Sequence, residues 1–478
     1  MSQDGVRVPQ EVLERLPPEA QVLVAALLAE VERLSAENAE LRARLAALEA
    51  RLGRNPRNSS VPPSAEHPHQ RPAAQPKKRG RRRGGQRGHR KHERALAPVG
   101  DCAEVVPLWP KSCRRCGGHL ADAGLEPLRH QVWELPEVRP LVTEYRRHRL
   151  LCPGCGVTTA APLPAGVPTG QSGPRLVAFT ALLMAYFRQS RRRTALFLEA
   201  LLGTPCSTGL TVKHQEIASA ALAGCHAELL AALPASDVAN VDETAAMEAG
   251  RKAWLWTAAT AAFTVFAVRL TRAGCVVREL LGEAYAGVVV SDRYAGYDHC
   301  LRRQICWAHL VRDFRAMAEA GGRAGTVGER LREAAEELFG HWHRARDGTI
   351  QGWTLRRRLG RLRTRVRELL EEGLRCGHAP TAGTCAHLLG RFEHLWTFAT
   401  EEGVEPTNNA AERALRHAVI WRKLSFGSQS DAGSRFVERT LSVVETCRQQ
   451  HRSPLEFVLQ SVQAHFRRQP GPSLLSEA

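Results

Sequence analysis

Apolar residues near the start of the chain follow a seven-residue period. Two series share this period with an offset of three residues: Val24, Val31, Asn38, Leu45 and Leu52, and Leu27, Leu34, Leu41 and Leu48. They match the a and d positions of a coiled coil, where a single polar a position such as Asn38 favours one register and a parallel dimer. We therefore expect residues 1–52 to be an acidic helix that forms a homodimer through residues 20–52. The alternative is an amphipathic helix packed on its own domain.

The apolar period stops in residues 53–95, which are rich in Pro, Arg and Gly. Such a composition predicts a basic linker that is disordered on its own. A compact cationic cluster lies within it: Lys77, Lys78, Arg79, Arg81, Arg82 and Arg83. This cluster could follow DNA phosphates or enter a minor groove. A solvated linker without specific contacts explains it equally well.

Helical spacing of apolar residues returns in segments 175–189 and 191–202. A Gly-Thr-Pro break follows, and Ser207 or Thr208 can cap a third helix. We expect residues 169–235 to be a helical, helix-turn-helix-like DNA-binding region. Any helical hairpin would show the same pattern.

From residue 236 the apolar pattern predicts strands before it predicts helices again. The expected strands are 238–242, 253–260, 264–268, 287–291 and 304–307, with a helix at 276–285 before the fourth, and the later helices are 328–346, 355–375, 384–400, 410–419, 434–450 and 455–468. This order is that of a ribonuclease-H-like α/β core, assigned to residues 236–425 with a helical insertion at 313–400. Helices at 426–478 complete a multidomain α+β protein.

Three carboxylates fall where such a core would bring them together. Asp242 is expected to close the first strand, Asp292 to close the fourth strand beside it, and Glu412 to open a later helix. Carboxylate oxygens suit Mg²⁺ or Mn²⁺, and two such ions about 4 Å apart promote in-line phosphoryl displacement. Glu243 and Asp298 compete for these roles. Neighbours suited to DNA contact are His309, Arg312, Arg413, Arg416 and Lys423.

Four of the 13 cysteines form two Cys-x2-Cys knuckles flanked by glycine: Cys113, Cys116, Cys152 and Cys155. Paired knuckles of this kind predict a tetrahedral structural Zn²⁺ site with no open position for catalysis. Residues 96–168 are therefore assigned to a zinc-binding module, with strands expected at 131–135 and 141–150. The alternative is two independent turns with free thiols.

Composition narrows the class of protein further. With 43% hydrophobic and 24% charged residues among 478, the bulk should be globular. The excess of 67 Lys and Arg over 49 Asp and Glu, a net charge of +18, indicates a polyanionic partner such as DNA. Asp4, Glu11 and Glu14 interrupt any signal peptide, and the longest apolar run is too short to span a membrane. We expect a cytoplasmic, nucleoid-associated bacterial protein with no membrane partner.

A series of short motifs, in this order, resembles the large transposase of IS66-type bacterial insertion sequences. The motifs are Arg57-Asn58-Ser59-Ser60, Gly84-Gly85-Gln86, the two cysteine knuckles, Val241-Asp242-Glu243-Thr244, Ser291-Asp292 with Tyr294-Ala295-Gly296-Tyr297, Cys306-Trp307-Ala308-His309, and the block 408–423. The resemblance spans nearly the whole chain. Segment 425–428 departs from it, because the family is more apolar and aromatic there.

The resemblance implies a D-D-E transposase with Asp242, Asp292 and Glu412 as its three acids. It also implies metal-dependent cleavage at the 3′ ends of an element in double-stranded DNA, joining of those ends to target DNA, and small helper proteins from the same element. Two other functions remain open. One is a zinc-containing DNA-binding regulator with an inactive core, and the other is a ribonuclease-H-like nuclease or resolvase.

Overall fold

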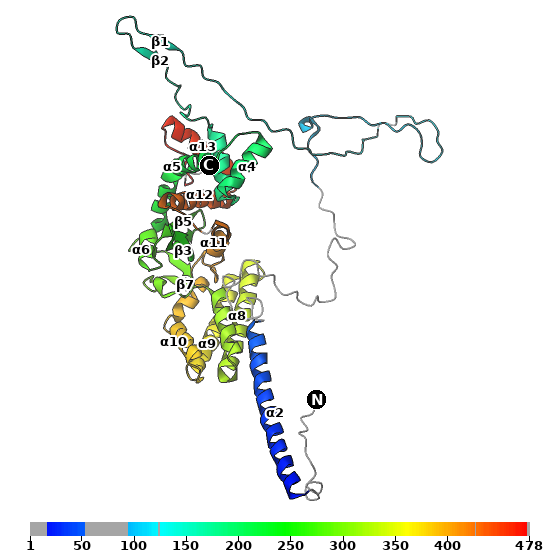
Figure 1. The fold of residues 1–478 in the computed structure, drawn as a ribbon, viewed down its shortest axis with the longest axis vertical. Helices are drawn as coiled ribbons and strands as arrows, with labels where there is room; N and C mark the ends of the chain where they lie inside the picture. The colour runs from blue at the N-terminus through cyan, green and yellow to red at the C-terminus, as the bar shows by residue number, and fades with distance from the viewer. Residues whose placement is uncertain (1–16, 53–93, 123–124, 426, 476–478) are drawn as a thin grey trace.

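The computed structural model describes residues 17–52, 94–122, 125–425 and 427–475. Its strands are β1 (Arg149–Leu151), β2 (Thr158–Ala160), β3 (Val238–Glu248), β4 (Arg251–Ala259), β5 (Thr264–Arg269), β6 (Val288–Ser291) and β7 (Arg303–Ile305). Its α-helices are α2 (Pro18–Leu52), α3 (Pro174–Ala185), α4 (Arg191–Leu202), α5 (Thr208–Ala232), α6 (Cys275–Leu281), α7 (Trp307–Glu319), α8 (Gly322–Arg346), α9 (Gly352–Leu374), α10 (Ala379–Leu389), α11 (Asn409–Ser425), α12 (Asp431–Gln449) and α13 (Pro454–Arg467). Figure 1 shows the larger sheet between α8–α10 at one end of the body and α4, α5, α12 and α13 at the other.

The larger sheet has the strand order β5-β4-β3-β6-β7. Strands β3, β4 and β5 are antiparallel, whereas β6 and β7 run parallel to β3. The pairing with β6 ends at Asn240, but β4 continues to pair with β3 as far as Glu248. The first strand is therefore much longer than the sequence predicted, because its antiparallel partner extends it.

Helix α12 covers the edge of this sheet with side-chain hydrogen bonds. The outward amides of Thr264, Phe266 and Val268 on β5 donate to the side chains of Thr446 (3.1 Å), Ser442 (2.8 Å) and Glu438 (2.9 Å), respectively. An edge strand normally leaves such amides unpaired. Here, three turns of one helix satisfy them.

One apolar core joins segments that the sequence assigned to different domains. It combines α3 and α5 with one face of the sheet and with α12 and α13, for example through Val177, Leu222, Phe266, Val444 and Val458. The predicted boundaries at 235 and 426 therefore do not separate independent cores. Helix α5 is long and apolar enough to cross a membrane by length and composition, but here it is a core helix packed against α3, α12 and α13.

The helical insertion packs on the other side of β6. Val289 faces the first core, whereas Val288 and Val290 face a second core that includes Trp307 and Trp396. This alternation follows from the two-residue period of a strand. The strand predicted at 304–307 is β7 at Arg303–Ile305. The insertion begins earlier than expected, because α7 starts at Trp307. Its end also differs, with α10 followed by the short 3-10 turns Phe392–Leu395 and Thr397–Ala399 instead of a helix at 384–400.

Local sequence signals place the other helices well. Helix α4 has the predicted bounds and ends at Gly203 in a left-handed conformation (φ 57°), and Ser207 caps α5 by accepting the amide of Leu210 at 3.1 Å. The strands predicted in the zinc module are mostly not observed. Residues 131–135 form no strand, and only residues 149 and 150 of the second predicted segment do, as part of β1. The helix predicted at 276–285 ends at Leu281.

Helix α2 projects away from the body in Figure 1, and its apolar series is exposed to solvent. Leu27, Leu34, Leu41 and Leu48 are each about half exposed. The single chain therefore does not cover the predicted dimer seam. The cationic cluster 77–83 and almost all of the predicted linker lie outside the described residues.

Candidate active site

Two neighbouring parallel strands position the two aspartates. Asp292 directly follows the last residue of β6, as predicted. Asp242 does not close its strand, because it still pairs with Thr257 of β4. It does lie two residues beyond Asn240, the last β3 residue paired with β6, so both aspartates lie at the same end of the β3–β6 pair.

The environment of Asp242 concentrates negative charge. Burial and the charges of Glu243, Asp292 and Glu412 raise its pKa to about 8, although an amide hydrogen bond from Glu243 (2.9 Å) lowers it in part. A buried carboxylate facing like charges holds its proton more tightly. A divalent cation would relieve that repulsion, so the charge distribution fits a cation site.

The loop after β6 is fixed around Asp292 by local and long-range hydrogen bonds. Asp292 Oδ1 accepts the amide of Tyr294 at 2.9 Å, a turn that orients the carboxylate. The buried guanidinium of Arg303 donates to Ser291 Oγ (3.0 Å), to the Asp292 carbonyl and to Asp298 (2.9 Å). Asp298 therefore holds Arg303 and belongs to the support of the loop.

Glu412 lies in the first turn of α11, where the helix dipole favours an acid. Burial raises its pKa, whereas the charges of Arg312 and Arg416 lower it and that of Asp292 raises it further. His309 Nδ1 of α7 lies 3.5 Å from Glu412 Oε1. Burial and the charge of Arg312 lower the pKa of His309 to about 4, which keeps the imidazole neutral near pH 7.

Asn408 ties three distant segments together at this site. It precedes α11 as expected, but its side chain reaches β3, where Nδ2 donates to the Val241 carbonyl at 2.8 Å. Its backbone amide donates to Cys306 Sγ at 3.2 Å, and its carbonyl accepts the amide of Glu412 at 3.1 Å. The start of α11 is thereby fixed against the strand that carries Asp242.

The side chain of Glu243 is buried and is held by hydrogen-bond partners of its own. Its carboxylate pairs with Arg272 at 2.7 Å and accepts a hydrogen bond from the Tyr297 hydroxyl. Burial and the Glu243 charge raise the pKa of Tyr297 well above its usual value, so the phenol stays protonated and donates. Sequence patterns alone assign no role to Arg272 or Tyr297, although Tyr297 lies in a motif noted for the resemblance.

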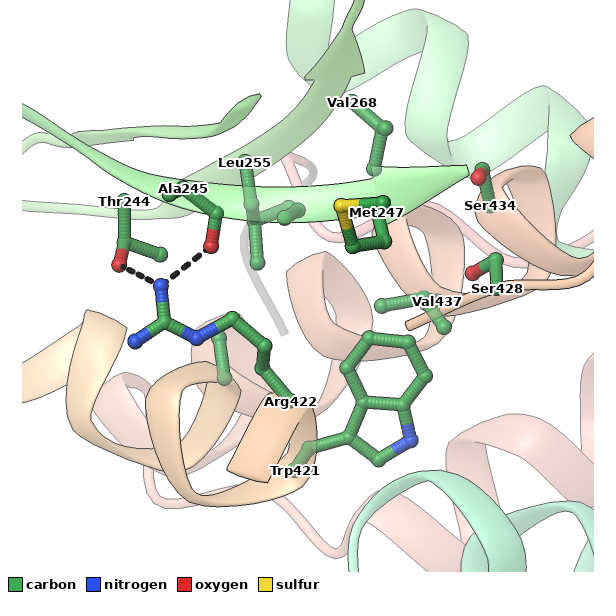
Figure 2. A pocket seen from close by; sticks show the side chains of 12 residues that line it. Thr244, Ala245, Met247, Leu255, Val268, Trp421, Arg422, Ser428, Ser434 and Val437 are labelled. Carbon is green, nitrogen blue, oxygen red and sulfur yellow. Dashed lines mark hydrogen bonds between the residues drawn. The ribbon is translucent and has the colours of Figure 1, made fainter. Parts of the chain in front are cut away.

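Helix α11 is anchored to β3 by a second arginine that the sequence did not single out. Figure 2 shows Arg422 donating from Nη1 to Thr244 Oγ1 (3.0 Å) and to the Ala245 carbonyl. Beside it, Trp421 and Met247 line a small pocket between α11, β3 and α12. The pocket is mostly apolar and lies on the far part of α11 from Glu412, so it serves the packing of this helix.

Several predicted DNA contacts surround Glu412. Arg312 lies on α7, one turn from His309, and Arg413 and Arg416 lie on α11 within about a turn of Glu412, whereas Lys423 lies in the last turn of α11, away from it. Arg413 and Arg416 are exposed, and within the described part of the chain neither forms an ion pair. Unpaired guanidinium groups beside a carboxylate cluster provide contacts for a phosphodiester.

The acids suit hard cations, but they do not form one tight ligand cluster. Oxygen atoms of Asp242, Asp292 and Glu412 do not all lie within 4.8 Å of one another. The Asp, Asp and Glu donor set nonetheless fits Mg²⁺ or Mn²⁺ in its chemistry. The described residues with ligand atoms that close together are Cys306, His309 and Glu412.

The two cysteine knuckles have the same local geometry. Amides of Cys116 and Arg115 lower the pKa of Cys113, and amides of Cys155 and Gly154 lower that of Cys152. Gly117 and Gly156 take left-handed conformations (φ 71° and 70°), which closes each turn. These turns favour thiolates and fit a zinc ligand set. The structure does not bring the four sulfurs into one cluster.

Comparison with known families is decisive for the core. The model of the transposase IS66 family matches residues 169–435, more than half of the chain. The chain belongs to the IS66 family of transposases. The zinc-finger domain of transposase IS66 matches residues 110–156, which include both knuckles and support a structural zinc. A family of unknown function, DUF6444, matches residues 9–95.

Two relatives of this IS66 family chain come from Sinorhizobium fredii (strain NBRC 101917 / NGR234). The uncharacterized protein y4qI is 25% identical over 209 residues, or 40% of this chain and 38% of y4qI. The uncharacterized protein y4hP is 25% identical over 389 residues, or 72% of this chain and 68% of y4hP. The first alignment thus spans well under half of the relative.

Proposed function

We propose that this chain is a DNA transposase that cleaves the 3′ ends of its element and joins them to target DNA. Asp242, Asp292 and Glu412 are the proposed catalytic acids. The observation that carries this assignment is the placement of Asp242 and Asp292 at the same end of the β3–β6 pair, with Glu412 close enough for its charge to act on Asp242. Burial and the charges of Glu243, Asp292 and Glu412 raise the pKa of Asp242 to about 8, and a site for cations would explain this concentration of carboxylates.

The proposed fold of the core is ribonuclease-H-like. The strand order β5-β4-β3-β6-β7, with three antiparallel and two parallel strands, supports it. In this arrangement β3 and β6 carry the two aspartates, and α11 carries the glutamate. The helical insertion lies between Asp292 and Glu412 in the sequence, and both acids keep their places at the sheet and at the start of α11.

Different residues of the chain would bind the cations and the phosphodiester. Bound Mg²⁺ or Mn²⁺ would activate the attacking oxygen and stabilise the leaving one. Asp242, Asp292 and Glu412 would hold these ions, and the Tyr294 amide orients Asp292 for that purpose. Arg312, Arg413 and Arg416 would hold the phosphodiester against the acids. Asn408 would hold the start of α11, which carries Glu412, against β3 while DNA is bound.

Recognition is proposed to use the rest of the molecule. The zinc module and cluster 77–83 would contact the element ends, and α2 would pair two chains so that both ends are held together. The exposed apolar series on α2 supports this pairing.

The test uses duplex DNA that carries the ends flanking this gene, with Mg²⁺ and the full chain. Asp242→Asn, Asp292→Asn and Glu412→Gln should each abolish cleavage and joining while binding in a gel-shift assay persists, because an amide cannot supply the negative charge that the cations need. Glu279→Gln is the matched control, because this exposed acid pairs with Arg269 away from the site. Joining by any of the three variants would remove its acid from the mechanism.

The same assay separates the two rival functions. A ribonuclease-H-like nuclease or resolvase would cut DNA without ever joining ends to a target. A DNA-binding regulator with an inactive core would do neither, and its binding would be the same in all three variants and the wild type.

A further inference from the structure

A second group of potential metal ligands lies at the edge of the carboxylate site. Cys306 precedes α7, His309 lies in the first turn of the same helix, and Glu412 lies in the first turn of α11. One ligand atom of each lies within 4.8 Å of the other two. The spacing of three residues puts Cys306 and His309 on one face of α7, toward α11.

One polar atom of this group lacks the partner expected at such depth. His309 Nδ1 is buried and has no hydrogen-bond partner among the described residues, although Glu412 Oε1 is 3.5 Å away. An unsatisfied buried donor or acceptor costs about 1–3 kcal/mol. Cys306 is fully buried, and its sulfur accepts the Asn408 amide at 3.2 Å. Burial raises the pKa of this thiol to about 11, so a metal ion that binds the sulfur must displace its proton.

We propose that Cys306, His309 and Glu412 bind one Zn²⁺ ion at a site distinct from the cysteine knuckles. A thiolate, a neutral imidazole and a carboxylate are typical zinc ligands, and their two negative charges neutralise the ion. Binding releases the Cys306 proton to solvent. Three protein ligands leave a fourth tetrahedral position for water. The side chain of Glu412 is 41% exposed, so the ion can enter from that side.

The surrounding charges set the affinity of the site. Arg312 and Arg416 lie near Glu412 and oppose a cation, whereas Asp292 favours one. The sulfur ligand decides the choice of metal, because Mg²⁺ avoids thiolates and zinc binds them readily. The site of Cys306, His309 and Glu412 is therefore selective for a softer metal ion than the site formed by the three carboxylates.

The functional consequence rests on the proposed transposase chemistry. Glu412 belongs to both ligand sets, so zinc at this site would compete with the catalytic cations for its carboxylate. Zinc at this site would withdraw Glu412 from the catalytic cations and inhibit cleavage. The chain would then be switched off by free zinc.

Direct binding tests the site without DNA or activity. Full-length protein with zinc already in the knuckles is titrated with Co²⁺, whose bond to a thiolate gives an absorption band in the near ultraviolet. We expect the wild type to bind one more Co²⁺ than Cys306→Ser and to show the band, which that variant loses. Cys275→Ser is the matched control, because this exposed cysteine lies outside the group, and it should behave as the wild type.

His309→Gln keeps the test decisive if Cys306→Ser folds poorly. It should retain the sulfur band but weaken Co²⁺ binding by roughly tenfold or more. Equal Co²⁺ binding by the wild type and both variants would overturn the proposal. The outcome is independent of the proposed function: cleavage without Co²⁺ binding removes the zinc site alone, and Co²⁺ binding without cleavage removes only the transposase mechanism.

Discussion

At the scale of single residues, the environment of Asp242 makes the stability of the chain depend on pH. Its pKa in the folded chain, about 8, lies far above the ordinary value of 3.8. The folded state therefore holds a proton that the unfolded state releases above about pH 4. The stabilisation from this group is complete below that pH and is lost as the pH rises through 8. Without metal, the chain is thus destabilised at the pH where its acids must be ionised.

Asp242→Asn should therefore stabilise the metal-free protein at pH 8. The gain in the free energy of unfolding should be on the order of 1–3 kcal/mol and should shrink toward pH 5. Denaturant unfolding at both pH values, without added divalent metal, measures it. Adding Mg²⁺ should stabilise the wild type and leave the variant unchanged.

Asp298→Asn provides a control of opposite sign. Hydrogen bonds from Arg391 and the charges of Arg391 and Arg303 lower the pKa of Asp298, so its contribution is present above the ordinary pKa and is lost in acid. Its replacement should destabilise the chain at pH 8. If the free energy of unfolding of Asp242→Asn, compared with that of the wild type, were lower at pH 8 than at pH 5, the result would contradict charge repulsion at Asp242.

Residue types and strand ends were enough to single out the candidate acids, but not their surroundings. Asp292 lies at the predicted strand end, whereas Asp242 lies within a longer strand because β4 extends the pairing. The contacts of Glu243 with Arg272 and Tyr297 join residues 29 and 54 positions apart. No local pattern encodes such contacts. The catalytic roles stay predictions until the variants are tested.

At the scale of elements, the bounds of α4 and the start of α5 followed from local signals. Ser207 and Gly203 mark real helix ends, since both act through their own backbone neighbours. Most of the strands predicted in the zinc module do not form, because their side chains, such as Leu135 and Leu141, remain exposed and have no sheet to join. An alternating apolar pattern specifies a strand only when a partner pairs with it.

The contact between α7 and α8 depends on a single glycine. A methyl group at Gly328 would lie 2.4 Å from the Ala318 nitrogen and 2.7 Å from the Phe314 carbonyl oxygen, so the helices could not approach as they do. Gly328→Ala should therefore lower the free energy of unfolding by about 1–3 kcal/mol. Thermal and denaturant unfolding of the full chain measure the change.

Gly340 on the same helix supplies the matched control. It has open space around it, so Gly340→Ala should stabilise the helix by up to about 1 kcal/mol through helix propensity. Equal effects of the two substitutions would show that propensity, and not the close approach to α7, governs both.

At the scale of the whole molecule, the exposed seam of α2 makes oligomeric state the central question. Asn38→Leu should raise thermal stability and loosen the choice of oligomer, because the buried amide no longer penalises other registers. Light scattering of the full-length protein after size-exclusion chromatography should show the wild type as a dimer and the variant as a mixture with higher oligomers.

Leu34→Glu, in the seam, should give a monomer, and Ala36→Glu, on the opposite face of the same turn, should remain a dimer. A wild-type monomer at high concentration would mean that the seam packs against something other than a second copy. Which surfaces meet in an assembly cannot be derived from one chain's pattern, since a heptad repeat fits both a partner and its own domain.

The ends of the helical insertion meet at one point. The Trp307 amide at its start donates to the Pro406 carbonyl at its end, at 2.9 Å. An excursion of chain that leaves and returns at the same place can be acquired, lengthened or exchanged by a gene without moving what lies on either side. The hydrogen bond between Trp307 and Pro406 therefore shows where such an insertion could be exchanged. Related proteins can therefore have or lack the whole insertion and keep the same arrangement of the three acids. The condition is that other apolar residues pack over Val288 and Val290.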